Sequence, residues 1–227
     1  MKVARLGIRT RLRATAGSVV DLRYRTGLRR LGKGKPADYR EYLDVQQRRT
    51  LSKRENDPGA GARELVRNVV DLGDLTPTSA VLCVGCRNAV ELDLFRAAGV
   101  GQVIGIDLVS RGPDILVMDM HDMRFEDAVF DAVYASHSLE HAYDVGAVVQ
   151  EIARVGRPGA VVGVEVPLGE SSSHADRVTF RNLDDLRAAV APVAADELWV
   201  DEQPAGSATN DQGTAITRIV FRLDGRS

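Results

Sequence analysis

The sequence predicts an α/β protein built on a doubly wound, seven-stranded sheet that is mostly parallel and ends in a C-terminal antiparallel hairpin. From Ser79 onward, short apolar runs alternate with helical segments, as parallel strands joined by crossover helices do. These runs are continuously apolar, which is typical of strands buried on both faces. The last two predicted strands follow each other without a helix between them, so they must be antiparallel neighbours.

Ahead of this alternation the chain is organised differently. Asp38–Glu55 and Ala60–Asp71 carry apolar residues at helical spacing, and Asn56–Gly59 between them combines turn-forming residues, so two helices joined by a turn are expected. The break at Gly32–Pro36 separates this pair from the N-terminal segment. We therefore predict three parts: a basic N-terminal arm at residues 1–35, a helical cap at 36–75 and a core at 76–227.

The elements of the core follow in order. Parallel strands are expected at 80–84, 102–106, 115–118, 130–135 and 160–166, and the hairpin strands at 197–200 and 216–223. Helices are expected at 88–98, 144–155 and 182–190, where apolar residues recur at helical spacing. Arg157–Gly159 is expected to be a turn that leads from a helix into the fifth strand.

Composition excludes several classes of protein. Hydrophobic residues make up 44% of the chain and charged residues 27%, as in ordinary globular proteins. An integral membrane protein is not expected, because no apolar run approaches the roughly 18 residues that a membrane-spanning helix needs. The N-terminus lacks the apolar segment of a secretory signal, and two cysteines cannot form a disulfide framework. We therefore expect a cytoplasmic protein.

The net charge of −2 hides an uneven distribution. Residues 1–35 contain eight arginines, three lysines and one acidic residue, a net charge of +10, so the remaining residues carry −12. A basic arm on an acidic body suggests contact with an anionic partner such as nucleic acid or a membrane surface. The alternative is that the arm contacts the protein's own acidic surface.

The carboxyl ends of the predicted strands carry the candidate site, because ligands of doubly wound sheets bind there. The residues at these ends are Gly85-Cys86-Arg87-Asn88, Asp107-Leu108, Asp119-Met120 and Ser136-His137. Asp107 follows Gly85 by 22 residues, near the spacing of about 20 expected for an acid that binds ribose hydroxyls. The loop lacks two glycines of the G-x-G-x-x-G pattern that cradles a pyrophosphate, so a nucleoside ligand without phosphates fits better.

Four segments in this order resemble the class I S-adenosylmethionine-dependent methyltransferases, in particular their methyltransferase-11-like group. The segments are VLCVGCRNAVEL, VIGIDL, DILVMDMHDMRFEDAVFDAVYASHSLEHAYD and EIARVGRPGAVVGVEVP, within a resemblance that covers about residues 60–223. It implies a Rossmann-like fold with a reversed last strand and S-adenosyl-L-methionine as cofactor.

The resemblance also implies a set of cofactor-binding residues. The methionine part of the cofactor would lie by Gly85, Cys86, Arg87 and Asn88, the ribose by Asp107 and Leu108, and the adenine by Asp119 and Met120, with Ser136 completing the set. Two positions depart from the family's Gly-Cys-Gly-x-Gly loop, namely Arg87 and Ala89. Arg87 either crowds the cofactor or pairs its guanidinium with the cofactor's carboxylate.

The expected reaction is methyl transfer to an oxygen or nitrogen of a small-molecule acceptor, with His137 as the candidate general base. No metal is expected, because the sequence lacks a second cysteine pair or another ligand set for zinc. Two alternatives stay open: a nucleic-acid methyltransferase that uses the basic arm, and a non-catalytic binding module. The Asn-Pro-Pro-Tyr or Asp-Pro-Pro-Tyr motif of base-amine methyltransferases is absent after the fourth strand, which argues against the first.

Overall fold

The computed structural model describes residues 31–52, 59–87, 89–169, 175–202 and 215–225. The predicted basic arm therefore lies outside the described residues, except for residues 31–35. Within that remainder Leu31 is buried and packs with Tyr39, Tyr42 and Leu43. A variant that tests the proposed arm should therefore lack residues 1–30 and keep Leu31.

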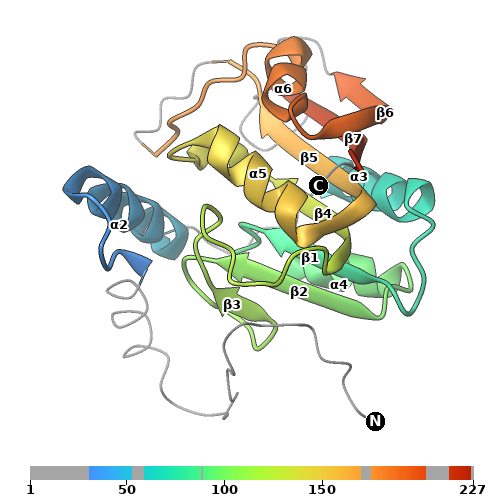
Figure 1. Ribbon diagram of the computed structural model, residues 1–227, viewed down its shortest axis with the longest axis horizontal. Helices are drawn as coiled ribbons and strands as arrows, with labels where there is room; N and C mark the ends of the chain where they lie inside the picture. The colour runs from blue at the N-terminus through green and yellow to red at the C-terminus, as the bar shows by residue number, and fades with distance from the viewer. Residues whose placement is uncertain (1–30, 53–58, 88, 170–174, 203–214, 226–227) are drawn as a thin grey trace.

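A seven-stranded sheet forms the centre of the molecule, in the order β3-β2-β1-β4-β5-β7-β6 (Figure 1). Its strands are β1 (Ala80–Val84), β2 (Gln102–Asp107), β3 (Ile115–Val117), β4 (Phe130–Ser136), β5 (Gly156–Pro167), β6 (Ala194–Glu202) and β7 (Ile216–Leu223). The first five strands pair in parallel, and β7 pairs antiparallel with both β5 and β6. The predicted fold class and the antiparallel hairpin are both confirmed.

The helices of the described residues are α2 (Ala37–Ser52), α3 (Gly59–Leu72), α4 (Val90–Ala97), α5 (Val145–Val155) and α6 (Leu183–Val190), with a short 3-10 helix, η1 (Leu139–His141). Helices α5 and α6 begin after the capping residues Asp144 and Asn182. Each cap accepts a hydrogen bond from the backbone N–H three residues later, which satisfies a donor that the first helical turn leaves unpaired.

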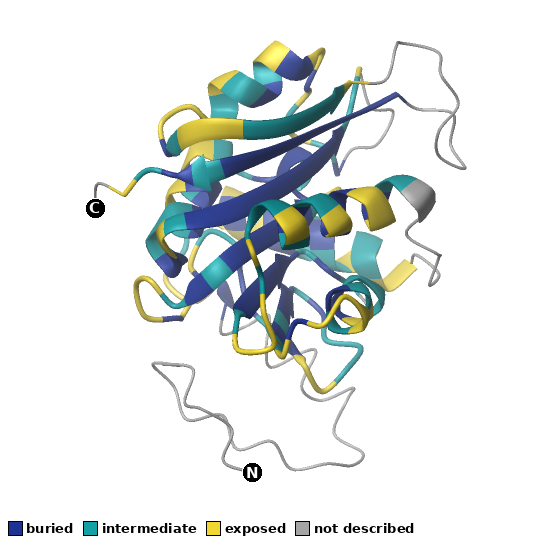
Figure 2. Cartoon of the chain, turned by 90° about the vertical axis from the view of Figure 1, so that its right-hand side faces the viewer, coloured by how far each residue is buried: buried dark blue, intermediate teal, exposed yellow. Residues whose placement is uncertain are grey.

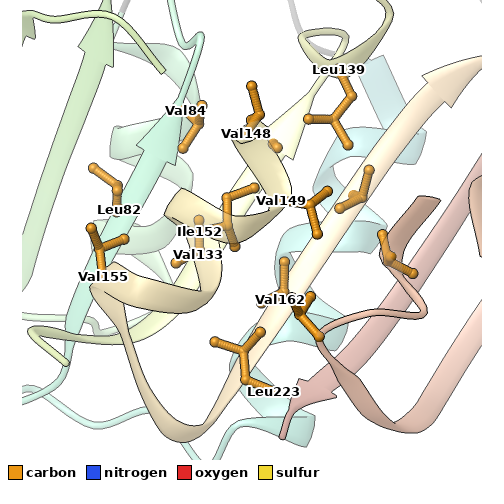
Figure 3. Packing of buried hydrophobic residues seen from close by; sticks show 14 of the residues in the cluster. Leu82, Val84, Val133, Leu139, Val148, Val149, Ile152, Val155, Val162 and Leu223 are labelled. Atoms are coloured by element: carbon orange, nitrogen blue, oxygen red, sulfur yellow. The ribbon is translucent and has the colours of Figure 1, made fainter. Parts of the chain in front are cut away.

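Two hydrophobic layers cover the faces of the sheet. Helices α5 and α6 bury their apolar sides in one layer, and α3 and α4 bury theirs in the other. Figure 3 shows the first layer, where Val148, Ile152 and Val155 of α5 lie against side chains of the strands. In Figure 2 the strands are mostly buried while the helices expose one side. Burial on both sheet faces explains why the strand sequences read as continuous apolar runs.

The predicted start of the fifth strand was wrong. Arg157–Gly159 was expected to form a turn ahead of the fifth strand, yet β5 begins at Gly156. Gly156 pairs with Phe130, whereas the next pair joins Val161 to Ala132. The extra residues are accommodated as an irregularity in the strand, and Gly159 adopts a positive φ of 77°, which glycine tolerates without a Cβ clash.

Helix α2 lies to one side of the sheet, apart from the helices on its two faces (Figure 1). Its buried tyrosines pack against Leu108, Val117 and Tyr143, and Leu108 and Val117 lie at the carboxyl ends of β2 and β3. The helix therefore covers the sheet end that the sequence marks as the candidate site. No helix within the described ranges is long and apolar enough to cross a membrane.

Candidate functional site

The strand order reverses at β1, which lies between β2 and β4, so the loops after β1 and β4 leave the sheet on opposite sides. Ligands of doubly wound sheets bind between such loops, and we call this region the crevice. Gly85 follows β1 with a φ of 70°. A Cβ at this residue would lie 2.6 Å from Cβ of Ser138, too close for any side chain. Glycine is thus required here both by the backbone conformation and by the close approach of the segment after β4.

Asp107 ends β2 and holds the loop that follows β1. Its Oδ2 atom accepts a hydrogen bond of 2.9 Å from the backbone N–H of Arg87, and Oδ1 accepts one of 3.1 Å from Val109. Burial raises the pKa of Asp107, although these N–H donors partly offset the rise. A carboxylate has about four acceptor positions, so both oxygens keep lone pairs for further donors.

Arg87 lies in the loop with a φ of 40°, a region that non-glycine residues seldom adopt. Its Nε atom is buried. Cys86 beside it is buried, and burial raises the pKa of its thiol well above the ordinary range. Asn88, the other predicted loop residue, lies outside the described residues.

Asp119 and its neighbours lie under helix α2. The Asp119 side chain is only 3% exposed, and its Oδ2 accepts a 2.7 Å hydrogen bond from the hydroxyl of Tyr39. Oδ1 accepts bonds from the backbone N–H and Nδ1 of His121 at 3.0 and 2.8 Å. Burial favours a higher pKa for Asp119, but the hydrogen bonds from His121 and Tyr39 outweigh it and hold the pKa below its ordinary value. Met120 is half-buried.

Helix α2 also contacts η1 and the segment that follows β5. The Gln46 amide donates to the carbonyl of Ala175 at 2.5 Å. Nη1 of Arg49 lies 2.9 Å from Nδ1 of His141 and 3.5 Å from Oδ1 of Asp176. Sequence reasoning missed these contacts and the one between Tyr39 and Asp119, because they join residues about 80 to 130 positions apart.

His137 follows β4 directly, as predicted, and adopts a positive φ of 49°. Its Nδ1 lies 3.5 Å from Oε1 of Glu140, and its Nε2 lies 3.3 Å from Oε1 of Glu165. The imidazole is 42% exposed, whereas both carboxylates are buried. Burial favours a higher pKa for Glu140, but the neighbouring imidazoles, that of His137 first, hold the pKa below its ordinary value.

Glu165 belongs to a buried ion pair that the sequence did not reveal. Its Oε2 accepts a 2.5 Å bond from Nε of Arg218, and both side chains are only 3% exposed. Arg218 also pairs with Asp201, and Ser136 donates its hydroxyl to Oε1 of Glu165 at 2.7 Å. Ser136, the last predicted cofactor residue, thus lies in the same network as His137.

Four buried polar atoms in the described part of the chain have no hydrogen-bond partner and come from segments that meet at the crevice. They are Arg87 Nε, Glu91 Oε2, Ser138 Oγ and Glu140 Oε2. Ser138 touches Gly85, and the charges of Arg87 and Glu140 both act on Arg49. Buried polar atoms are nearly always paired, so this set indicates a ligand that offers both charges and hydrogen-bonding groups.

S-adenosylmethionine has these properties. It carries a carboxylate, an ammonium group, a sulfonium and two ribose hydroxyls, and the crevice offers a guanidinium, carboxylates and a glycine that allows close approach. The residues present therefore fit this cofactor. Among the described residues no group of three or more histidine, cysteine or acidic side chains is arranged to hold a metal ion.

Comparisons with known proteins find similarity to methyltransferases. Residues 82–164 match the family model described as a methyltransferase domain. A sterol 24-C-methyltransferase from Aspergillus fumigatus is 50% identical over 46 residues. That match covers 20% of this chain and 12% of the sterol enzyme, so the chain spans about an eighth of its curated relative.

Two solved structures share the fold. One is a 1,6-didemethyltoxoflavin-N1-methyltransferase from Burkholderia thailandensis with bound S-adenosylhomocysteine, with a TM-score of 0.57, 16% identity, and 94% of this chain and 93% of that chain covered. The other is the cyclase SpnF, with a TM-score of 0.56, 16% identity, and coverage of 71% and 81%. The comparisons thus show a match to a methyltransferase domain over residues 82–164 and a fold shared with a methyltransferase structure that holds S-adenosylhomocysteine.

Proposed function

We propose that this chain transfers a methyl group from S-adenosylmethionine to an oxygen or nitrogen of a small-molecule acceptor. The observation that carries the proposal is the set of four partnerless buried polar atoms around the loops after β1 and β4. They surround the sheet end where ligands of this fold bind. The match to a methyltransferase domain supports reading this set as a cofactor site.

The cofactor would be held by the residues that the sequence suggested. Gly85, Cys86, Arg87 and Asn88 would contact its methionine part, Asp107 and Leu108 the ribose, and Asp119, Met120 and Ser136 the remainder. When bound, S-adenosylmethionine supplies a methyl group on a positively charged sulfur. The protein would align the acceptor in line with that methyl group, since positioning supplies most of the catalysis in such a displacement. His137 would take the proton that the acceptor loses.

A small acceptor is favoured by helix α2. Its contacts with Asp119 at one end and with Ala175 at the other cover the crevice, so an extended polymer would have to displace the whole helix. Proteins with similar sequence or fold include methyltransferases named for a sterol and for a toxoflavin precursor. Both are small molecules. The buried free thiols of Cys83 and Cys86 support a reducing, cytoplasmic compartment.

Two rival functions make different predictions. A nucleic-acid methyltransferase would bind RNA or DNA through residues 1–30, with an affinity that falls steeply as salt rises. A non-catalytic module would bind the cofactor without turnover, and the similarity in fold to the cyclase SpnF shows why fold alone does not exclude it. Deletion of residues 1–30 tests the nucleic-acid rival, and a methyl-transfer assay tests the non-catalytic one.

The cofactor site is tested by changing Asp107. We expect calorimetry to show micromolar S-adenosylhomocysteine binding to the wild type and at least about 10-fold weaker binding to Asp107→Ala. The reason is that each hydrogen bond between a buried carboxylate and a ribose hydroxyl contributes about 1.5–3 kcal/mol.

The matched control is Asp114→Ala, which removes an exposed carboxylate paired with Arg96 and should leave affinity unchanged. Asp107→Asn keeps the shape of the side chain but has one acceptor oxygen, so it can hold the N–H of either Arg87 or Val109 and not both. A melting curve of both variants checks whether the loop change has altered the fold. Wild-type affinity in Asp107→Ala would show that the cofactor lies elsewhere.

A further inference from the structure

The loop after β1 contains a strained arginine. Arg87 adopts a φ of 40°, a strained conformation for a non-glycine residue that persists mainly at functional sites. The hydrogen bond from its N–H to Asp107 fixes the backbone in this conformation. Glycine would adopt it without strain, so the arginine side chain needs an explanation that the fold does not provide.

The side chain of Arg87 lies near that of Glu91, in the first turn of α4. The Arg87 charge acts on the Glu91 carboxyl. Even so, Arg87 Nε and Glu91 Oε2 are both buried without a hydrogen-bond partner among the described residues. Two opposite charges therefore lie close together beside Gly85, and each keeps a buried atom that an incoming group must satisfy.

The Glu91 carboxyl is in surroundings that favour the binding of a cation. Burial raises its pKa to about 7. The charged groups that act on it are Arg87, which lowers its pKa, and Glu165 and Asp107, which raise it. A carboxyl in this state becomes fully ionised when a positive group binds next to it.

We propose that Arg87 and Glu91 together bind the amino-acid end of the cofactor, the guanidinium taking the α-carboxylate and the Glu91 carboxylate taking the α-ammonium. This inference rests on the proposed function. An α-amino acid carries both charges on one carbon, so it can satisfy two opposite charges that lie side by side. Guanidinium–carboxylate pairs are also among the strongest hydrogen-bonded contacts in proteins. In this chain two charged side chains would then select for the zwitterion.

The test compares two ligands that differ only in this end. S-adenosylhomocysteine carries the amino acid, whereas 5′-methylthioadenosine has the same adenosine and a thioether without it. We expect Arg87→Leu and Glu91→Gln each to weaken binding of S-adenosylhomocysteine at least about 10-fold in calorimetry, since a charge-assisted hydrogen bond is lost. Binding of methylthioadenosine should change less than about 2-fold, since each variant removes only a contact to the missing group.

Two control variants test whether the loss of affinity is specific to the amino-acid end of the ligand. Arg96→Leu removes a half-buried arginine of α4 that pairs with Asp93 and Asp114 and donates to the carbonyl of Val103; it should affect neither ligand. Arg87→Gly relieves the backbone strain, so it should fold at least as stably as the wild type and still lose affinity for S-adenosylhomocysteine. A melting curve for each variant checks the fold.

A second readout is the pH dependence of binding. Below pH 7 the Glu91 carboxyl is mostly protonated and must release its proton to pair with the ammonium. The wild-type affinity for S-adenosylhomocysteine should therefore rise about 5- to 10-fold between about pH 6 and pH 7.5. The affinity for methylthioadenosine should rise less over the same pH range. In Glu91→Gln the pH dependence of the affinity should be the same for both ligands.

Three outcomes would overturn the proposal. The first is an equal effect of Arg87→Leu on both ligands, and the second is tighter binding of S-adenosylhomocysteine by Arg87→Gly, which would mean that Arg87 crowds the site. In either case the cofactor still binds, so the proposed function stands. The third is a wild type that binds neither compound, which would overturn the proposed function as well.

Discussion

His137→Ala should lower the rate of methyl transfer by about 10²–10⁴-fold, the usual contribution of a positioned general base, while cofactor affinity stays within a few-fold of the wild type. The imidazole lies at the carboxyl end of β4 and is 42% exposed, so an acceptor can reach it. Glu140, 3.5 Å from Nδ1, can hold a proton on that nitrogen. Nε2 would then be the nitrogen that accepts a proton from the acceptor.

The same contacts allow a purely structural role, in which His137 links Glu140 to Glu165. His137→Asn separates the two roles, because asparagine tolerates a positive φ and keeps hydrogen-bonding capacity but cannot act as a base. Turnover and melting temperature should be measured on the same preparations. An asparagine variant with wild-type turnover, or an alanine variant with full turnover and a lowered melting temperature, would exclude His137 as the base.

Arg218→Met should destabilise the protein by about 3–5 kcal/mol, because it leaves the Glu165 carboxylate buried without its counter-charge. Both side chains of this pair are only 3% exposed. Burial favours a lower pKa for Arg218, but its two carboxylate partners, Glu165 first, outweigh burial and hold the pKa above the ordinary value. For a chain of this size the expected loss corresponds to a fall in melting temperature of about 6–20 °C.

The double variant Glu165→Gln with Arg218→Met removes both charges and should recover most of that loss, since a neutral buried pair avoids the cost of an unpaired ion. Arg187→Met is the surface control. Its partner Glu197 is also well exposed, and water screens such pairs, so its melting temperature should barely change. A double variant as unstable as Arg218→Met alone would show that packing, not charge, explains the effect.

The strands could be predicted from the sequence because the signal is local. Each parallel strand contains a short apolar run, and the first of them ends at a glycine, as Val84 before Gly85 shows. Strand β6 was underestimated, since it runs from Ala194 to Glu202 and includes acidic residues that its place at the sheet edge leaves exposed. Pairing with β7, not composition, makes those residues part of the strand.

The position of several candidate site residues in the sheet could be predicted in the same way. Gly85, Asp107 and Ser136 could be placed together because the carboxyl ends of parallel strands share one edge of a sheet. The Glu165–Arg218 pair could not, since its partners lie 53 residues apart on strands whose adjacency only the fold determines. Glu91 resembles an ordinary acid in the first turn of a helix, and its partnerless buried oxygen becomes visible only in three dimensions.

The hydrogen bond between Tyr39 and Asp119 has a consequence for any adenine that binds there. Oδ2 of Asp119 already accepts a bond from the Tyr39 hydroxyl, and Oδ1 already accepts two from His121. Three of the roughly four acceptor positions of this carboxylate are therefore taken, which leaves an incoming amine a single one, on Oδ2. One hydrogen bond adds only about 1.5–3 kcal/mol even at a charged group, so most of the cofactor's affinity would have to come from its ribose and its amino-acid end.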